Sequence, residues 1–271
     1  MKKRTFLDFL LRWIDVFGTA LVGAAVVLGL CGCEPEGEDE GGGSTNGIRA
    51  VCIGVENGFA GACPGAVVDA KRMANLLWNS GAGEVELLVD GGATRKKVLE
   101  KMKWAASGEL AIIFYSGHGG QSFSGDASEE DKKDEFMCLW DKGLLDDDIW
   151  EVLSRGKRVV LVCDCCHSKT MFRAGDKMLQ MVKRMSRSKD GAAKPRNGFK
   201  MLCWSGCPDS EYSYGSSDGG ELTNALLRHF KNGMSYRELW KAVLEDTSLK
   251  SFEDVQETVL GTDFRDLEAF K

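Results

Sequence analysis

Two short motifs place a histidine and a cysteine where they could act together on a substrate. YSGHGG covers residues 115–120 and contains His118, and DCCHS covers 164–168 and contains Cys166. A thiolate can attack a carbonyl group while a neighbouring imidazole takes up and returns its proton. Glycines beside the histidine would let a peptide backbone approach closely and would leave N–H groups to hold an oxyanion. The two motifs therefore indicate nucleophilic catalysis by a cysteine.

Other chemistries fit the cysteine-rich segment less well. Cys163 and Cys166 have the CxxC spacing of a zinc pair, but a structural zinc site needs a second tight pair, and none accompanies this one. A thioredoxin-like redox site needs its CxxC at the start of a helix and assigns no role to His118. Small buried cysteines are common in protein cores, but a core role does not explain the glycines around His118.

Strands alternate with helices along most of the chain. Apolar, partly β-branched runs predict strands, and apolar residues at helical spacing predict helices. The expected strands are 48–55, 84–90, 109–117, 158–164 and 199–206, and the expected helices are 67–81, 94–107, 146–155, 220–231 and 235–247. This order indicates an α/β fold with a mainly parallel sheet and helices on both faces. Both motifs stand at carboxyl ends of strands, where the working crevice of such sheets lies.

Composition and charge limit the classes of partner. The chain has 271 residues, of which 43% are hydrophobic, so it can bury a full core. Residues 1–33 carry four basic and two acidic residues, a net charge of +2; subtracting this from the total of −6 leaves −8 for the remainder. An acidic body argues against nucleic acid as a partner.

The amino terminus has the features of an export signal. MKKR precedes an apolar run that ends at Cys31, and the run is shorter than the roughly 20 residues that span a membrane. Its end, LCGC, resembles a bacterial lipoprotein signal, so we expect a signal at 1–33 with a lipid on Cys33; a short single-pass anchor is the alternative. Residues 34–47 are rich in glycine and acid and predict a flexible tether. We therefore expect an exported, membrane-associated protein of the cell envelope with its folded domain at 48–271.

The motifs resemble those of metacaspases, the caspase-like cysteine peptidases of bacteria, protists, fungi and plants. YSGHGG and DCCHS look like the two catalytic motifs of that family, and the 48 residues from the histidine to the cysteine match a caspase feature of about 50. CPGAVVDAKRMANLL at 63–77 resembles the segment after the family's first strand. DEFMCLWD at 134–141 resembles its acidic loop, and QETVLG at 256–261 resembles its final strand. The resemblance covers nearly all of 48–271 and implies a caspase-like fold and a hydrolase, although the caspase motif QACxG is absent.

The resemblance implies catalytic roles for three residues. His118 would be the general base, Cys166 the nucleophile, and the backbone N–H groups of Gly119 and Cys166 the oxyanion hole. One position departs from the family pattern, because Lys169 replaces a glycine three residues after the nucleophile. A cation there would lower the pKa of the thiol, or it would crowd the groove.

The resemblance also implies a substrate pocket. Asp69, Ser116 and Asp164 would line the pocket for the residue before the cut, and Asp209 would add a further carboxylate. Two carboxylates beside a nucleophile bind arginine or lysine and repel acidic side chains. We therefore expect an endopeptidase that acts on protein or peptide substrates after Arg or Lys. The alternative is a non-catalytic, membrane-tethered caspase-fold binding module.

Calcium is the cofactor that the resemblance raises. In calcium-dependent metacaspases the matching acids would be Asp134, Asp146 and Asp147, joined by a fourth acid seven residues after the cysteine. Here that fourth position is Arg173, whose positive charge opposes a divalent cation. We therefore expect that no cofactor is required and that the protein is active without calcium.

A basic segment follows the cysteine motif. Residues 169–200 contain ten basic residues and two acidic ones, residues 186–198 have turn-forming residues and no core pattern, and a basic loop is expected at about 173–198. These features predict an exposed loop. A loop of this charge beside an Arg/Lys-specific site would be a substrate for self-cleavage near Arg184, Arg187 or Lys189, and a solvated basic linker is the alternative.

Overall fold

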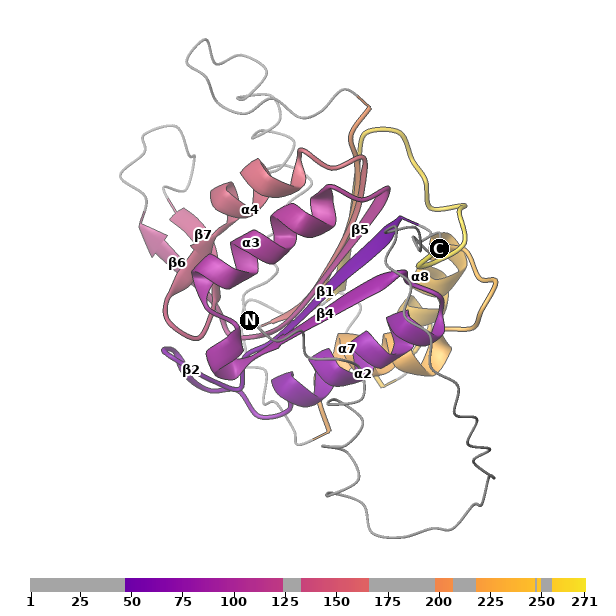
Figure 1. Ribbon diagram of the computed structural model, residues 1–271. Coiled ribbons are helices and arrows are strands. Elements are labelled where there is room, and N and C mark those ends of the chain that lie inside the picture. The colour runs from indigo at the N-terminus through magenta and orange to yellow at the C-terminus, as the bar shows by residue number, and fades with distance from the viewer. Residues whose placement is uncertain (1–46, 124–132, 166–197, 207–217, 247, 250–254) are drawn as a thin grey trace, which may run out of the picture. The chain divides into compact units, whose positions relative to one another are not determined.

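The computed structural model of the protein describes residues 47–123, 133–165, 198–206, 218–246, 248–249 and 255–271 (Figure 1). The predicted lipid site at Cys33 and nearly all of the predicted tether and basic loop lie outside these residues. No helix among the described residues is long and apolar enough to cross a membrane.

A six-stranded sheet forms the centre of the domain, in the order β11-β10-β9-β5-β1-β4. Its strands are β1 (Ile48–Gly54), β4 (Glu84–Val89), β5 (Leu110–Gly117), β9 (Arg158–Cys165), β10 (Lys200–Gly206) and β11 (Val255–Leu260). All neighbouring strands run parallel except β10 and β11, which are antiparallel. The predicted mainly parallel sheet is therefore confirmed, and the strand boundaries lie within a residue or two of those expected.

Helices cover both faces of this sheet, as predicted (Figure 1). One face packs against α3 (Arg95–Ala106) and α4 (Asp146–Leu153), and the other against α2 (Ala66–Asn79), α7 (Glu221–His229) and α8 (Tyr236–Leu244). Every residue of β5 is buried, which is what a strand covered on both faces requires. Two apolar cores result, one on each side of the sheet.

The start of α3 is held by a residue that is distant in the sequence. Thr94 is its N-cap residue, but the Thr94 side chain makes no capping hydrogen bond. Instead, the backbone N–H of Arg95 donates to Asp141 Oδ1 at 2.8 Å. An acceptor from a distant turn therefore replaces the local cap.

Two small sheets were not predicted from the sequence. They are the hairpin of β2 (Asn57–Gly58) with β3 (Gly61–Ala62), and the three-stranded antiparallel sheet of β6 (Gly119–Phe123), β7 (Lys133–Cys138) and β8 (Gly143–Leu145). The expectation of an acidic loop at DEFMCLWD is wrong for its first part, since residues 134–138 belong to β7. Met137 and Leu139 are fully buried, and their burial holds this segment in the core that also contains α3 and α4.

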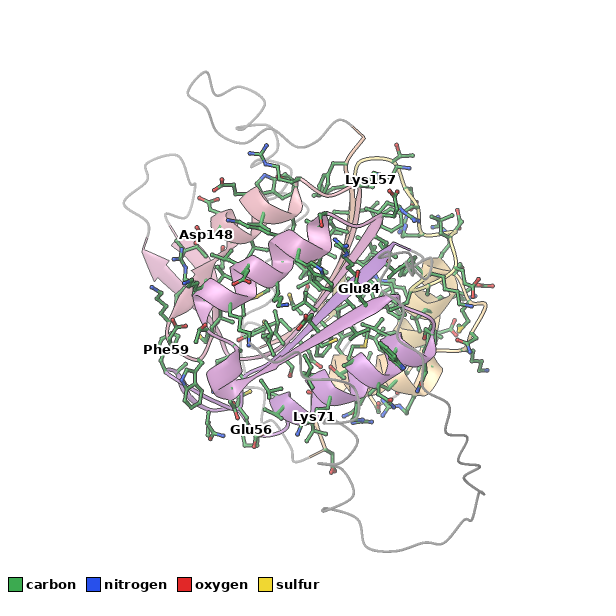
Figure 2. All side chains as sticks on the ribbon, in the orientation of Figure 1. Glu56, Phe59, Lys71, Glu84, Asp148 and Lys157 are labelled. Atoms are coloured by element: carbon green, nitrogen blue, oxygen red, sulfur yellow. The ribbon has the colours of Figure 1, made fainter. Side chains whose placement is uncertain are left out.

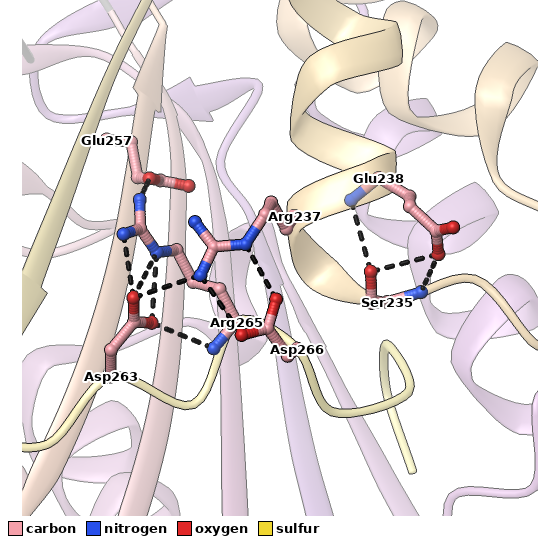
Figure 3. A network of polar contacts seen from close by, with 7 residues as sticks. All are labelled: Ser235, Arg237, Glu238, Glu257, Asp263, Arg265 and Asp266. Carbon is pink, nitrogen blue, oxygen red and sulfur yellow. Dashed lines mark hydrogen bonds and ion pairs between the residues drawn. The ribbon is translucent and has the colours of Figure 1, made fainter.

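The carboxyl-terminal segment is tied to α8 and β11 by ion pairs (Figure 3). Arg265 binds Glu257 of β11 and Asp263, and Arg237 of α8 binds Asp263 and Asp266. Asp263 Oδ1 also accepts a hydrogen bond from the Arg265 backbone N–H at 2.9 Å.

Four strands of the main sheet end in one row. Gly54 of β1 is paired with Ser116 of β5, Ser116 with Asp164 of β9, and Asp164 with Gly206 of β10. A Cβ atom added to Gly54 would lie 2.5 Å from the Ala66 carbonyl oxygen. Helix α2 therefore approaches this row so closely that β1 must end in glycine.

We predict that Gly54→Ala lowers the free energy of unfolding by about 2 kcal/mol, since overpacking a tight contact costs about 1–3 kcal/mol. Urea denaturation of the purified protein measures the change. Gly92→Ala is the matched control, because a Cβ atom there meets nothing within 4 Å. Equal stability of the two variants would contradict the close approach of α2.

Candidate active site

The structure describes part of the predicted site. The described site residues are Asp69, Ser116, His118, Gly119 and Asp164. Cys166 and Asp209 lie outside the described residues.

The two motifs that contain His118 and Cys166 start from neighbouring strand ends. Gly117, the last residue of β5, is paired with Cys165, the last residue of β9. His118 follows the first directly in the chain, and Cys166 follows the second. The parallel register thus brings together two motifs that are 48 residues apart in the sequence.

The imidazole of His118 is oriented by a backbone carbonyl. Its Nε2 lies 2.9 Å from the carbonyl oxygen of Ala62, on β3. A carbonyl only accepts hydrogen bonds, so Nε2 carries the proton and Nδ1 is the nitrogen that can take up another. In this tautomer the imidazole could act as a general base through Nδ1.

The backbone of His118 is held as well. Its carbonyl oxygen accepts from the Tyr115 hydroxyl at 2.6 Å and from the Cys138 N–H at 2.9 Å. Tyr115 is fully buried, and burial raises the pKa of its phenol well above the usual range, so it stays a neutral donor. The sequence analysis assigned no role to Tyr115 or to Ala62. Tyr115 stands inside the first motif, but a backbone carbonyl such as that of Ala62 has no signal in the sequence.

Asp69, Ser116 and Asp164 lie together, at the start of α7. Asp69 Oδ2 accepts from the Ser116 hydroxyl at 3.0 Å and from the Gly220 N–H at 2.8 Å. Asp164 Oδ2 accepts from the N–H and the hydroxyl of Thr223, at 2.8 and 2.6 Å. Both carboxylates therefore receive N–H groups at a helix N-terminus, where the macrodipole also favours negative charge.

Asp69 is the more constrained of the two carboxylates. Its side chain is 1% exposed, and its Oδ1 has no hydrogen-bond partner. Burial, followed by the negative charge of Asp164, raises its pKa to about 7 against the lowering effect of the Gly220 N–H and the Ser116 hydroxyl. Asp69 also stands in the first turn of α2, but a role in stabilising that helix alone does not explain why its side chain reaches β5 and α7.

Two glycines pack directly on the carboxylates. A Cβ atom at Gly219, whose φ is +91°, would lie 2.0 Å from Asp69 Oδ1, and one at Gly220 would lie 2.2 Å from Asp164 Oδ2. Any larger residue would collide with a carboxylate oxygen. The sequence analysis missed this segment, although a Gly-Gly pair before a helix is a visible signal of close approach.

The cysteines of β9 do not fit a metal or redox site. Cys163 and Cys165 are buried, and burial raises the pKa of the Cys163 thiol well above its usual range. A thioredoxin-like motif needs its cysteine at the start of a helix, but Cys163 lies within a strand. In the described parts of the chain, no three His, Cys, Asp or Glu side chains are arranged to hold a metal ion.

The structure places only part of the set of acids that matches the calcium ligands of calcium-dependent metacaspases. Asp146 and Asp147 form the first turn of α4, where the helix dipole favours them, and the Asp147 N–H donates to Asp146 Oδ1 at 2.9 Å. The side chain of Asp134 lies outside the description. Two neighbouring carboxylates do not by themselves supply the six to eight oxygens that calcium takes.

Comparison with known proteins gives a consistent family. The caspase domain family matches residues 48–259. The chain is 25% identical over 247 residues to Metacaspase-1 of Cryptococcus neoformans, covering 67% of this chain and 54% of that protein. It is 26% identical over 248 residues to Metacaspase-5 of Trypanosoma cruzi, covering 77% of this chain and 56% of that protein. The chain thus spans about half the length of these curated relatives.

A solved structure supports the fold. The crystal structure of protein GSU0716 from Geobacter sulfurreducens is similar with a TM-score of 0.62 and 26% sequence identity. The match covers 82% of this chain and 98% of that one.

The buried Asp69 leads to a pH prediction. The pKa of Asp69 in the folded protein, about 7, is above its ordinary value of 3.8. Between pH 3.8 and pH 7 this group is therefore more often protonated in the folded state than in the unfolded state. Stability should therefore fall as the pH rises through this window, by about 3 kcal/mol from pH 5 to pH 8 from this group alone. We predict that Asp69→Asn removes this slope, as measured by urea unfolding at a series of pH values.

Asp263→Asn is the control for this experiment. The side chain of Arg265 holds the pKa of Asp263 below its usual range, and its ion-pair partners are arginines, which do not titrate in this range. Asp263 is therefore ionised in both states above pH 5, so its replacement should leave the slope between pH 5 and 8 unchanged. An unchanged slope in Asp69→Asn would show that Asp69 titrates normally.

Proposed function

The chain belongs to the caspase domain family of peptidases, and from that premise we propose that it is a cysteine endopeptidase that cuts after arginine or lysine. His118 removes the proton from the Cys166 thiol, and the thiolate attacks the carbonyl carbon of the scissile peptide bond. The N–H groups of Gly119 and Cys166 stabilise the oxyanion. His118 then protonates the leaving amine, and water hydrolyses the acyl-enzyme with His118 again as the base.

The orientation of His118 supports the catalytic part of this proposal. Ala62 accepts the Nε2 proton, and the two donors on the His118 carbonyl restrain the backbone from which the imidazole projects. A base held in one tautomer loses little freedom when it reacts. These restraints also argue against the non-catalytic alternative, which would have no need of them.

The single observation that carries the specificity is the buried oxygen of Asp69 that lacks a partner. This Oδ1 stands beside Asp164, and burial, followed by the negative charge of Asp164, raises the pKa of Asp69. A substrate guanidinium or ammonium group would supply the missing donor and offset the two negative charges. Gly219 covers Oδ1 in this structure, so the substrate side chain reaches it only when that segment shifts.

Two expectations depend on residues that the structure does not describe, and they stay predictions. They are the absence of a calcium requirement, which rests on Arg173, and the lipid on Cys33, which would hold the protein at the membrane. We also expect that the protein does not bind nucleic acid. Residues 1–33 carry a net charge of +2, and subtracting this from the total of −6 leaves −8 for the remainder.

We predict cleavage after Arg and Lys and very little after Asp in a peptide library varied at the residue before the cut. Asp164→Ala should lower kcat/KM for Arg peptides by about 10- to 100-fold, because one charge-assisted contact contributes about 1.5–3 kcal/mol. Asp209→Ala should lose far less activity.

Cys166→Ala is the control for catalysis and should have no turnover. Turnover that survives in this variant would contradict the catalytic proposal, whereas preference for acidic or large apolar residues would contradict only the pocket. Binding of peptides without any cleavage by the wild-type chain would favour the non-catalytic module.

We also predict self-cleavage in the basic segment, near Arg184, Arg187 or Lys189. Intact mass spectrometry of the wild type should find two fragments, and Cys166→Ala should stay whole. If both proteins stay whole, or both are cut alike, the segment is a linker rather than a substrate.

A further inference from the structure

Asp90 has an unusual backbone conformation. It lies directly after β4, at the start of the short 3-10 helix η1 (Asp90–Gly92), and its φ is +41°. Within the described ranges, Phe270 is the other non-glycine residue with positive φ. This region is costly for most side chains, although aspartate and asparagine tolerate it better than others. The surrounding structure must therefore hold Asp90 in place.

The side chain of Asp90 binds a distant loop. Its Oδ1 accepts hydrogen bonds from the backbone N–H groups of Glu56 at 2.8 Å and Asn57 at 3.0 Å. These two residues lead from β1 into the β2–β3 hairpin, and Figure 2 labels Glu56 and Phe59 on this segment. The strained conformation thus aims a carboxylate at the entrance of the hairpin.

The same hairpin carries the carbonyl that orients the catalytic histidine. Asn57, which binds Asp90, is the direct cross-strand partner of Ala62. The Ala62 carbonyl in turn accepts the Nε2 proton of His118 at 2.9 Å. Only the pair Asn57 and Ala62 therefore lies between the Asp90 carboxylate and the hydrogen bond that selects the tautomer of His118.

The hairpin cannot hold this position by itself. Its ladder contains two residue pairs, and a ladder this short is unstable in isolation. Two backbone hydrogen bonds among the described residues also involve the hairpin. The Cys63 N–H donates to the Glu56 carbonyl oxygen at 2.7 Å across its open end, and the Phe59 N–H donates to the Trp140 carbonyl oxygen at 3.2 Å. Asp90 adds a side-chain acceptor for the N–H groups of Glu56 and Asn57, where the first strand of the hairpin begins.

We propose that Asp90 is a positioning residue for the catalytic base. It holds the β2–β3 hairpin so that the Ala62 carbonyl stays within hydrogen-bond distance of His118 Nε2. The inference rests on the proposed role of His118 as general base. Asp90 itself would touch neither the substrate nor the reacting atoms. It lies in the segment that follows an edge strand of the sheet.

Three variants separate positioning from simple stability. Asp90→Asn keeps an Oδ1 acceptor and tolerates the positive φ, so it should retain wild-type kcat. Asp90→Gly fits the backbone but has no acceptor, and its kcat should fall about tenfold or more with little change in KM, as expected for a misplaced catalytic group. Asp90→Ala loses the acceptor and keeps the strain, so it should lose both kcat and thermal stability.

A spectroscopic measurement tests the contact without relying on activity. The chain has three histidines, so imidazole ¹⁵N signals can be assigned in a Cys166→Ala background by comparison with His118→Ala. His118 should be mainly the Nε2–H tautomer in this background and with Asp90→Asn. Asp90→Gly should shift it toward a mixture of tautomers.

Asp263→Ala is the matched control, since it also removes an Oδ1 that accepts a backbone N–H, in a segment tied to α8 and β11 (Figure 3). It should lower stability but leave the His118 signal and kcat unchanged. Wild-type kcat and tautomer in Asp90→Gly would overturn the inference. If His118→Ala stays active, the proposed function fails, while the ¹⁵N signals still decide whether Asp90 positions the imidazole.

Discussion

The parallel register between β5 and β9 is the constraint on which the site depends. It aligns Ser116 with Asp164 and Gly117 with Cys165, so that both motifs leave the sheet at the same edge. A shift of one residue would turn the side chains of one strand to the opposite face. Both faces of β5 are buried, so the close packing of its side chains in the two cores, rather than an alternation of apolar and polar residues, opposes such a shift. The core thereby sets the geometry of the chemistry above it.

The second constraint is the placement of the buried carboxylate of Asp69 beside the half-buried carboxylate of Asp164. Asp69 and Asp164 would repel one another strongly in an apolar surrounding, and the start of α7 offsets this by presenting the N–H groups of Gly220 and Thr223. The compensation is incomplete, as the raised pKa of Asp69 indicates. The pair therefore lowers the stability of the folded state when both carboxylates are ionised. It is also the pair on which the proposed specificity rests.

Much of the architecture could be predicted from local sequence. Strands such as β5 and β9 are continuous apolar runs, and α2 has apolar residues at helical spacing, so their type follows from periodicity alone. The small sheet of β6, β7 and β8 could not be predicted in this way. Its strand β7 begins with charged residues and contains the buried Glu135, which gives it the composition of a loop. Only pairing with its neighbours makes it a strand.

The sequence by itself determined which residue types stand at the strand ends, including His118, Asp164 and the glycines beside them. It determined this because local periodicity marks where each strand stops. The tertiary structure decided which of these residues meet. The Ala62 carbonyl on His118, the Thr223 donors on Asp164 and the Asp90 carboxylate on Asn57 all join segments more than 30 residues apart. Such contacts depend on loop paths and on backbone atoms that every residue has, so no residue type marks them in advance.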